Sequence, residues 1–358
     1  MDTGIVIANT GSPSAPTPDA VETYLSSYLM DPHIRQLPKI AWNILLRKAI
    51  LPKRRFSSSE RYRFVWEEGG APLVAHQERL RAKVQWMCNR EGLLPSATGG
   101  VSVRSAMSYG DPSMADALAS LREDGSERVL CLPLYPQTAS CITGSVADSF
   151  ERTLAELGWD PPRRVVEGYA QNAFYLEAVA SSIEGRGFGQ RPDDRLVLSF
   201  HSVPLKDERA GDTYRQQARQ TADAVAERLG VDPASVTVSY QSVFGPDPSA
   251  WARPLSLDVL RGWRDQEFRV FFCCPGFAVE CLETLYDVPQ ELLSALEGDE
   301  VEPPSPARCL KGGAIGPGGR FVWVPCLDDS DAHAVVVRSV IDDALRDGSW
   351  TGIESSLG

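Results

Sequence analysis

Two stretches of this chain repeat one pattern of strand, turn and helix start, and this repetition limits the folds that the chain can adopt. VSVRSAMSYGDPS, from Val101, aligns with VTVSYQSVFGPDPS, from Val236, with one inserted residue. RVLCLPLYPQTAS, from Arg128, aligns with RVFFCCPGFAVEC, from Arg269. Strands that alternate with helices in this way indicate two similar α/β units with mostly parallel sheets. The alternative is that any two βαβ units share this much pattern.

A third pair of segments sets the register between the two units. IVIANTGSP ends at Pro13 and LVLSFHSVP ends at Pro204, so Thr10 corresponds to His201. The turn formers and charges of GWDPPRRVVEGY mark the boundary. We therefore predict a first lobe over residues 1–168 and a second over 169–326. Both lobes are expected to be Rossmann-like, with a ligand cleft between them at the carboxyl ends of the strands.

Length and charge exclude several classes of protein. A chain of 358 residues, 43% hydrophobic, is long enough for two domains. Its net charge of −12 argues against general nucleic-acid binding. The N-terminus opens directly into a strand, so we expect no signal peptide. No apolar run reaches about 18 residues, so no membrane-spanning helix is predicted and we expect a cytoplasmic protein.

The eight cysteines do not form a recognisable framework. No CxxC pair occurs, and the spacings are wider than those of zinc or iron–sulfur sites. Cys131, Cys273 and Cys274 lie in apolar strand runs, where cysteine usually serves as a small buried hydrophobe. We therefore expect neither a disulfide scaffold nor a bound metal cluster.

A histidine and a glutamate follow two of the predicted buried strands. His201 ends the run RLVLSF, and Glu283 lies in FFCCPGFAVECLETLYD. An imidazole and a carboxylate at the carboxyl ends of strands suit metal and proton chemistry in an α/β cleft. The alternative for His201 is a histidine that caps a neighbouring loop.

An acidic row continues from Glu283. ECLETLYDVPQELL has helical spacing, which places Glu283, Asp287 and Glu291 along one edge of the predicted helix. Pro289 is expected to kink or loosen this helix. A solvated helix face is one explanation of the row, and a path for a cation inward or protons outward is the other.

Residues 35–55 form a basic amphipathic segment. This stretch holds seven lysines or arginines and no acid, among apolar residues such as Trp42. Such a surface suits a flat apolar molecule that carries carboxylates, or an anionic membrane surface. The alternative is a basic helix face packed on the lobe. RYRFVWEEGGAPL, with Arg61 and Tyr62, extends the same kind of surface.

No GxGxxG, P-loop or GxSxG motif is present, which argues against a dinucleotide enzyme, an NTPase and a hydrolase. The chain instead resembles the ferrochelatases over nearly its whole length. The resemblance rests on NTGSPSAPTPDAVETYLSSYLMDPHI, SSSERYRFVWEEGGAPL, SYGDPS, LPLYPQTA, SFHSVP, GDTYRQQARQTADAVAERLG, QSVFGPDP, PGFAVECLETL and VPCLDDSDAH. Its opening is most similar to the group found in Gram-negative bacteria.

The resemblance implies insertion of Fe²⁺ into protoporphyrin IX, the last step of haem synthesis. It implies that His201 and Glu283 are the catalytic and metal-site residues, and it places Glu280 in the relay with Asp287 and Glu291. It also implies that a C-terminal helix over 327–348 packs on the first lobe. We assign porphyrin contacts to Thr10, Trp42, Arg61, Tyr62 and Tyr135.

Fe²⁺ is then a substrate and no cofactor is required. A [2Fe–2S] cluster held by C-terminal cysteines is not expected, because no cysteine follows Cys326. The chain departs from many family members at Ser202, where they have glycine, and at Ala71, where they have serine. Coproporphyrin III as substrate, a cobalt or nickel chelatase, a non-enzymatic tetrapyrrole carrier and peripheral attachment to the inner membrane stay open as alternatives.

Overall fold

The computed structural model describes residues 1–35, 37–90, 99–243, 247–298, 301–302, 304–316, 318–347 and 349–351. The chain divides into two compact units. Unit 1 comprises Met1–Tyr135, Ser140–Tyr169 and Asp329–Gly358, and unit 2 comprises Pro136–Ala139 and Ala170–Asp328. The predicted boundary at 168 and the observed one at Tyr169 differ by one residue. The short excursion of residues 136–139 into unit 2 was not predicted.

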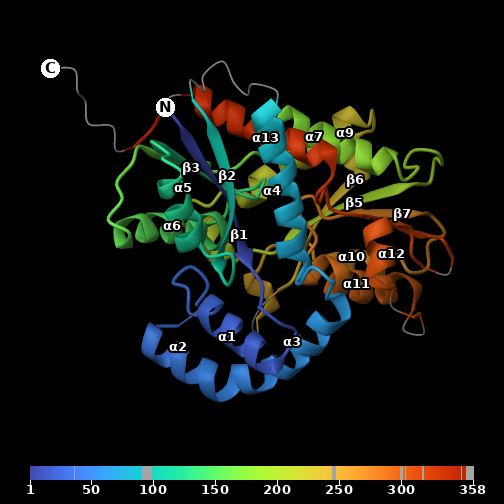
Figure 1. Cartoon of the computed structure of the whole chain (residues 1–358). Coiled ribbons are helices and arrows are strands. Elements are labelled where there is room, and N and C mark those ends of the chain that lie inside the picture. The colour runs from blue at the N-terminus through green and yellow to red at the C-terminus, as the bar shows by residue number, and fades with distance from the viewer. Residues whose placement is uncertain are drawn as a thin grey trace. The chain divides into compact units, whose positions relative to one another are not determined.

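Unit 1 is built on a four-stranded parallel sheet with the order β2-β1-β3-β4 (Figure 1). Its strands are β1 (Thr3–Gly11), β2 (Val101–Tyr109), β3 (Arg128–Pro133) and β4 (Arg163–Val165). Unit 2 has a five-stranded sheet with the order β6-β5-β7-β9-β8, parallel except at the edge strand β8. Its strands are β5 (Arg195–His201), β6 (Val236–Gln241), β7 (Val270–Cys273), β8 (Gly313–Ala314) and β9 (Phe321–Val324).

The strand orders confirm the repeat that the sequence predicts. In unit 1 the matched strands run β2-β1-β3, and their counterparts in unit 2 run β6-β5-β7. Thr10 lies next to the end of β1, and His201 is the last residue of β5. The prediction of an α/β fold with two similar parallel-sheet lobes is therefore confirmed.

Helices connect the strands of each unit. Unit 1 contains α1 (Pro18–Tyr28), α2 (Lys39–Leu45), the π-helix η1 (Leu46–Ile50), α3 (Leu51–Val65), α4 (Pro72–Arg90), α5 (Met114–Glu123), the π-helix η2 (Ser140–Gly144), α6 (Ser145–Glu156) and α13 (Asp331–Arg346). Unit 2 contains α7 (Ala173–Glu184), α8 (Leu205–Arg209), α9 (Tyr214–Arg228), η3 (Pro233–Ser235), η4 (Pro248–Ala250), α10 (Ser256–Gly262), the π-helix η5 (Glu283–Asp287), α11 (Val288–Glu297) and α12 (Pro306–Lys311). Among the residues that the structure describes, no helix combines the length and the apolar run needed to cross a membrane.

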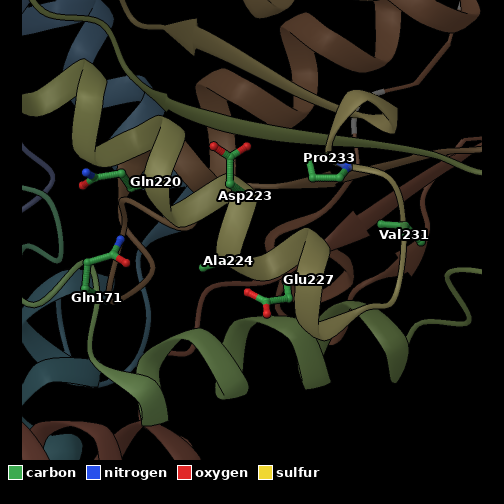
Figure 2. A pocket seen from close by; sticks show the side chains of 7 residues that line it. All are labelled: Gln171, Gln220, Asp223, Ala224, Glu227, Val231 and Pro233. Carbon is green, nitrogen blue, oxygen red and sulfur yellow. The ribbon is translucent and has the colours of Figure 1, made fainter.

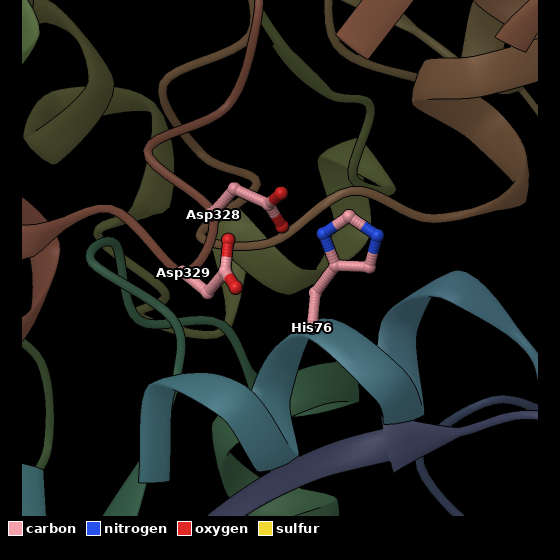
Figure 3. Close-up of side chains that lie close together, drawn as sticks. All are labelled: His76, Asp328 and Asp329. Carbon is pink, nitrogen blue, oxygen red and sulfur yellow. The ribbon is translucent and has the colours of Figure 1, made fainter. Parts of the chain in front are cut away.

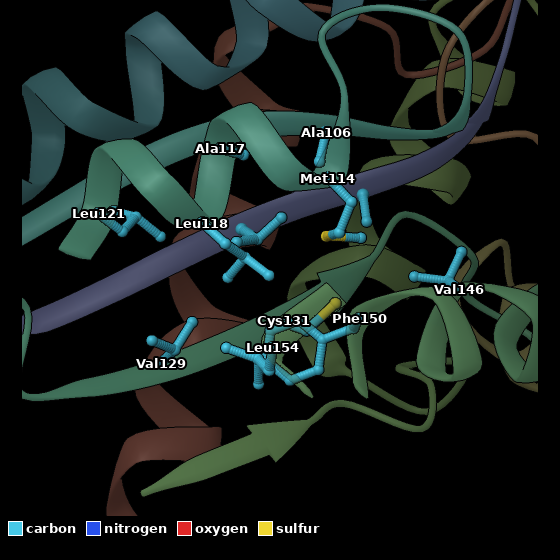
Figure 4. Packing of buried hydrophobic residues seen from close by; sticks show 12 residues of the cluster. Ala106, Met114, Ala117, Leu118, Leu121, Val129, Cys131, Val146, Phe150 and Leu154 are labelled. Atoms are coloured by element: carbon cyan, nitrogen blue, oxygen red, sulfur yellow. The ribbon is translucent and has the colours of Figure 1, made fainter. Parts of the chain in front are cut away.

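The core of unit 1 lies between its sheet and the helices α5 and α6. Val6 and Ala8 of β1 are fully buried. Figure 4 shows Phe150 of α6, also fully buried, beside Leu154 and Cys131. Each large apolar side chain buried in this way stabilises the fold by about 1.5–3 kcal/mol. The near-continuous apolar run of β1 follows from burial on both faces of the sheet, which is usual for a central parallel strand.

The C-terminal helix α13 packs on α4 within unit 1 (Figure 1). The side chain of Ser330 caps its first turn by accepting a hydrogen bond from the backbone N–H of His333. Lys83 of α4 donates to the carboxylate of Asp331 at 2.9 Å. A cap and a charge pair thus fix the start of α13 against α4.

Candidate functional site

His201 is held at the end of β5 with one ring nitrogen already engaged. Its Nδ1 lies 2.7 Å from the backbone carbonyl oxygen of Ser202. A carbonyl oxygen only accepts hydrogen bonds, so Nδ1 carries the proton in the neutral ring. The lone pair then lies on Nε2, where it can accept a proton or bind a metal ion. A histidine that ligates a metal commonly has this second hydrogen bond.

Ser202 is itself firmly placed. Its side chain is buried, its N–H donates to the carbonyl of Gln241 at 2.7 Å, and its hydroxyl donates to the carbonyl of Ala252 at 3.2 Å. On the other side, the ring of Phe277 lies with its centroid 6.4 Å from that of His201. The imidazole is therefore oriented by a fixed carbonyl and a neighbouring aromatic ring.

Glu283 is the first residue of η5 and is half-buried. The segment is helical, as predicted, but residues 283–287 form a π-helix, in which the N–H of Val288 donates to the carbonyl of Glu283, before α11 begins. Pro289 explains part of the difference. It has no N–H to donate to the preceding turn, and the wide turn ends just before it. Short π segments occur often at functional sites.

The thiol of Cys281 lies beside the Glu283 carboxylate. Burial raises the pKa of Cys281, and the negative charge and hydrogen bond of Glu283 raise it further. The hydroxyl of Thr284 is 3.8 Å from the sulfur. A protonated thiol therefore neighbours the carboxylate that the sequence assigns to the metal site.

Glu280 is fully buried and acts as a clamp in unit 2. Its Oε1 accepts a 2.8 Å hydrogen bond from the N–H of Cys326, and its own N–H donates to Asp328. Burial and the Glu280 charge raise the pKa of Cys273 and of Cys309 to about 12. These thiols stay protonated at neutral pH, which agrees with the expectation that Cys273 is a small buried hydrophobe.

The four acidic residues of the predicted relay differ in exposure. Glu280 is buried, Glu283 and Asp287 are half-buried, and Glu291 on α11 is exposed. His201 is the last residue of β5, and Glu283 comes ten residues after the end of β7, the strand that pairs with β5 in the sheet of unit 2.

In unit 1 the structure brings Thr10 and Tyr135 together. The Tyr135 hydroxyl accepts from the backbone N–H of Thr10 at 2.8 Å, also bonds to its hydroxyl, and donates to the side chain of Asn9 at 2.8 Å. Two residues that sequence analysis assigned separately to porphyrin contacts thus form one polar cluster at the ends of β1 and β3.

The other three assigned porphyrin contacts lie on α2 and α3. Trp42 is 2% exposed and its indole N–H donates to the carbonyl of Leu29. Tyr62 is also buried, and its ring meets that of Trp66 edge to face. Arg61 is exposed. Trp42 and Tyr62 are therefore buried by protein atoms in this structure, and their assignment to porphyrin stays a prediction.

The remaining three histidines have partners in unit 1. His33 bonds to Ser140 and Asp148 at 2.9 Å each. His76 on α4 bonds to Glu67 at 2.8 Å. Figure 3 shows His76 with Asp329, which also belongs to unit 1. Arg79 already pairs with Asp329 at 2.6 Å, so within unit 1 this group is a charge network. His333 lies in the first turn of α13 and is buried.

A surface groove of unit 2 lies beside α9 (Figure 2). Asp223, one of its two acids, pairs with Arg219 at 3.0 Å. None of the predicted site residues lines this groove. The lining residues are Gln171, Gln220, Asp223, Ala224, Glu227, Val231 and Pro233.

Sequence analysis missed Gln137 and Tyr175, two buried polar residues of unit 2 that support the segment leading to Glu283. Gln137 was visible in LPLYPQTA as a polar residue just after a buried strand, but its partners lie on helices far along the chain. Only the tertiary structure brings them together.

The fold is that of the chelatases. The structure of SirB, a sirohydrochlorin chelatase from Bacillus subtilis, matches 97% of this chain and 97% of its own chain with a TM-score of 0.53. Its sequence identity is 9%, so the likeness concerns the fold.

Sequence comparison is more specific. The family model named Ferrochelatase matches residues 2–312. The ferrochelatase of Nitrosococcus oceani is 32% identical over 99% of this chain and 89% of its own length. That of Haemophilus influenzae is 32% identical over 96% of this chain and 98% of its own. The chain belongs to the ferrochelatase family. This confirms the predicted family and class of enzyme, a metal-inserting lyase of haem biosynthesis.

Proposed function

We propose that this enzyme inserts Fe²⁺ into protoporphyrin IX, with His201 and Glu283 as the pair that handles metal and protons. The reaction replaces two pyrrole N–H protons by the metal, so the site must bind a borderline cation and remove two protons. The observation that carries the proposal is the hydrogen bond from His201 Nδ1 to Ser202, which leaves Nε2 as a base and ligand. Imidazole suits ferrous iron in both respects.

The acidic series supports a route for the released protons. Glu283 comes after β7, the strand that pairs with β5. Glu283 and Asp287 are half-buried, and Glu291 is exposed. Carboxylates placed in steps from a half-buried to an exposed position can pass protons to solvent. Glu280 has a different part in this proposal, because its buried carboxylate bonds to the backbone of Cys326. It holds the segment before η5 in place.

The test is an assay of Fe²⁺ insertion under anaerobic conditions. The loss of porphyrin fluorescence and the gain of haem absorbance measure its rate. We expect turnover with protoporphyrin IX to exceed turnover with coproporphyrin III, and Fe²⁺ to exceed Ni²⁺, without any added cofactor. Faster turnover with coproporphyrin III would identify that porphyrin as the substrate. Preference for Co²⁺ or Ni²⁺ would identify the enzyme as a cobalt or nickel chelatase. Tight porphyrin binding without insertion of any metal would identify a carrier.

We also propose peripheral attachment to an anionic membrane through α2 and α3. Ile40 is 79% exposed and Ile44 54% exposed on α2, and Phe56 on α3 is 51% exposed. Arg47 and Lys48 lie exposed between them in the sequence. Apolar side chains interleaved with cations are suited to the headgroup boundary of anionic lipids, where hydrophobic porphyrins partition.

Liposome sedimentation tests this attachment. We expect the wild type to bind vesicles with anionic lipid at low salt, and Ile40→Ser/Ile44→Ser to bind at least several-fold less. Phe174→Ser is the matched control, because Phe174 is 52% exposed but lies on α7 in unit 2. Absence of wild-type binding, or an equal loss in the control, would contradict the proposal.

A further inference from the structure

The segment between β7 and Glu283 is anchored from outside at its first residues. The Tyr175 hydroxyl on α7 donates a 2.8 Å hydrogen bond to the carbonyl of Pro275. Further along, the carbonyl of Ala278 accepts from Asp328. The two anchors hold Pro275 and Ala278 on either side of Phe277, whose ring neighbours His201. The Pro275 turn therefore carries the aromatic neighbour of His201 and begins the segment that leads to Glu283.

Behind Tyr175 lies Gln137, which is 1% exposed. Its Nε2 is 3.2 Å from the Tyr175 hydroxyl and 3.0 Å from that of Thr221. The Tyr175 proton goes to Pro275 and the Thr221 proton to Ala170, so both hydroxyls must accept from Gln137. Only an amide nitrogen can donate twice, which fixes the orientation of this amide.

The amide oxygen then faces the turn itself. A Cβ placed on Gly276 would lie 3.3 Å from Gln137 Oε1 and 3.4 Å from the ring of Phe200, the residue before His201. Gln137 therefore lies beside the turn, linked through Tyr175 to Pro275 and with its Oε1 next to the position of a side chain at residue 276. The close approach explains why the turn carries a glycine.

The path of the backbone also brings Gln137 to the turn at Gly276. Residues 136–139 belong to unit 2, although the segments on both sides belong to unit 1. Within this excursion Gln137 bonds to α7 and α9, and the N–H of Thr138 donates to Gln217 on α9 at 2.9 Å. A backbone detour of four residues thus delivers one buried amide to the turn before the site.

We infer that Gln137 and Tyr175 are positioning residues for metal insertion, acting through the Pro275–Phe277 turn on His201 and Glu283. The inference rests on the proposed function, since it assigns them to that reaction. Neither residue is required to touch porphyrin or iron. Loss of the Tyr175 hydroxyl should let the turn drift, and small displacements of reacting groups cost rate rather than binding.

The test compares Tyr175→Phe with Thr221→Val. Both remove one hydroxyl that Gln137 contacts, but only the Tyr175 hydroxyl is also hydrogen-bonded to the turn, at Pro275. For Tyr175→Phe we expect kcat to fall about fivefold to tenfold, with the porphyrin Kd unchanged. For Thr221→Val we expect a clearly smaller loss of kcat than for Tyr175→Phe, because Gln137 keeps its bond to Tyr175 and the Tyr175 hydroxyl still holds Pro275. Gln137→Met should match or exceed the loss in Tyr175→Phe.

Hydrogen exchange of the peptide spanning residues 274–283 gives a readout that is independent of turnover. We expect faster exchange in Tyr175→Phe than in the wild type or Thr221→Val. Wild-type exchange in Tyr175→Phe, or equal losses of kcat in the two variants, would overturn the positioning role. A wild type that inserts no iron would overturn the proposed function instead, and the exchange comparison would still decide whether Tyr175 holds the turn.

Discussion

The imidazole of His201 donates from Nδ1 to the carbonyl oxygen of Ser202, the residue that follows it in the chain, across 2.7 Å. This hydrogen bond fixes the tautomer of the His201 ring. The backbone carbonyl takes the place of the carboxylate that often binds the second ring nitrogen of a metal-ligating histidine. The carbonyl holds its direction because the Ser202 N–H and hydroxyl are both bonded elsewhere in unit 2.

His201→Ala should lower kcat by at least about 100-fold, since it removes the proposed base and metal ligand together. The porphyrin Kd, measured by fluorescence quenching, should change little, because the ring is assigned to metal and protons. Ser202→Gly should keep most activity, since glycine retains the carbonyl. Near-normal turnover in His201→Ala would remove this residue from the mechanism.

Substitutions in the acidic series should slow turnover less as the substituted residue lies farther from Glu283 in the sequence. Glu283→Gln should approach the loss seen in His201→Ala. Asp287→Asn should slow turnover about tenfold, and Glu291→Gln about threefold or less, because an exposed carboxylate can be replaced by water. Initial rates over a range of buffer concentrations measure this, since small buffer acids can substitute for a missing relay group. Equal losses at Glu283 and Asp287 would contradict a graded relay.

Tyr135→Phe should weaken porphyrin binding while leaving kcat close to normal. The hydroxyl organises Thr10 by accepting from its N–H, and the loss of one hydrogen bond of about 1 kcal/mol raises KM about fivefold. Tyr240→Phe in unit 2 serves as the matched control, since it removes a largely buried hydroxyl that is not assigned to porphyrin. An unchanged KM in Tyr135→Phe would contradict the porphyrin contact assigned to Tyr135.

The buried thiols predict a loss of stability in alkali. Burial holds the pKa of Cys273 and Cys309 at about 12, against 9.0 for a free thiol. Above pH 9 the unfolded chain releases these protons while the folded chain keeps them, so the free energy of unfolding should fall. The decline is up to about 1.4 kcal/mol per thiol for each pH unit between 9 and 12. Urea unfolding at pH 8, 9 and 10 measures it, and Cys273→Ala/Cys309→Ala should show a shallower decline.

Strand patterns and motifs predicted much of this molecule. The repeat gave the common order of three strands in each sheet, because buried parallel strands leave a strong apolar signature. His201 was predicted at a strand end for the same reason. The type of helix at Glu283 was not predictable, since α and π turns differ in hydrogen bonding rather than in the spacing of polar residues. Nor was the burial of Trp42, because an amphipathic pattern does not say which face is covered.

The π-helix at Glu283–Asp287 makes this region sensitive to chain length more than to composition. A π turn contains one residue more than an α turn. Substitutions can therefore leave the turn intact, whereas deletion of one residue within it would restore α geometry. Such a deletion would rotate Glu283 by about 100° relative to α11. During divergence, an insertion or deletion in these five positions would redirect the Glu283 carboxylate at once, while point changes would leave its direction unaltered.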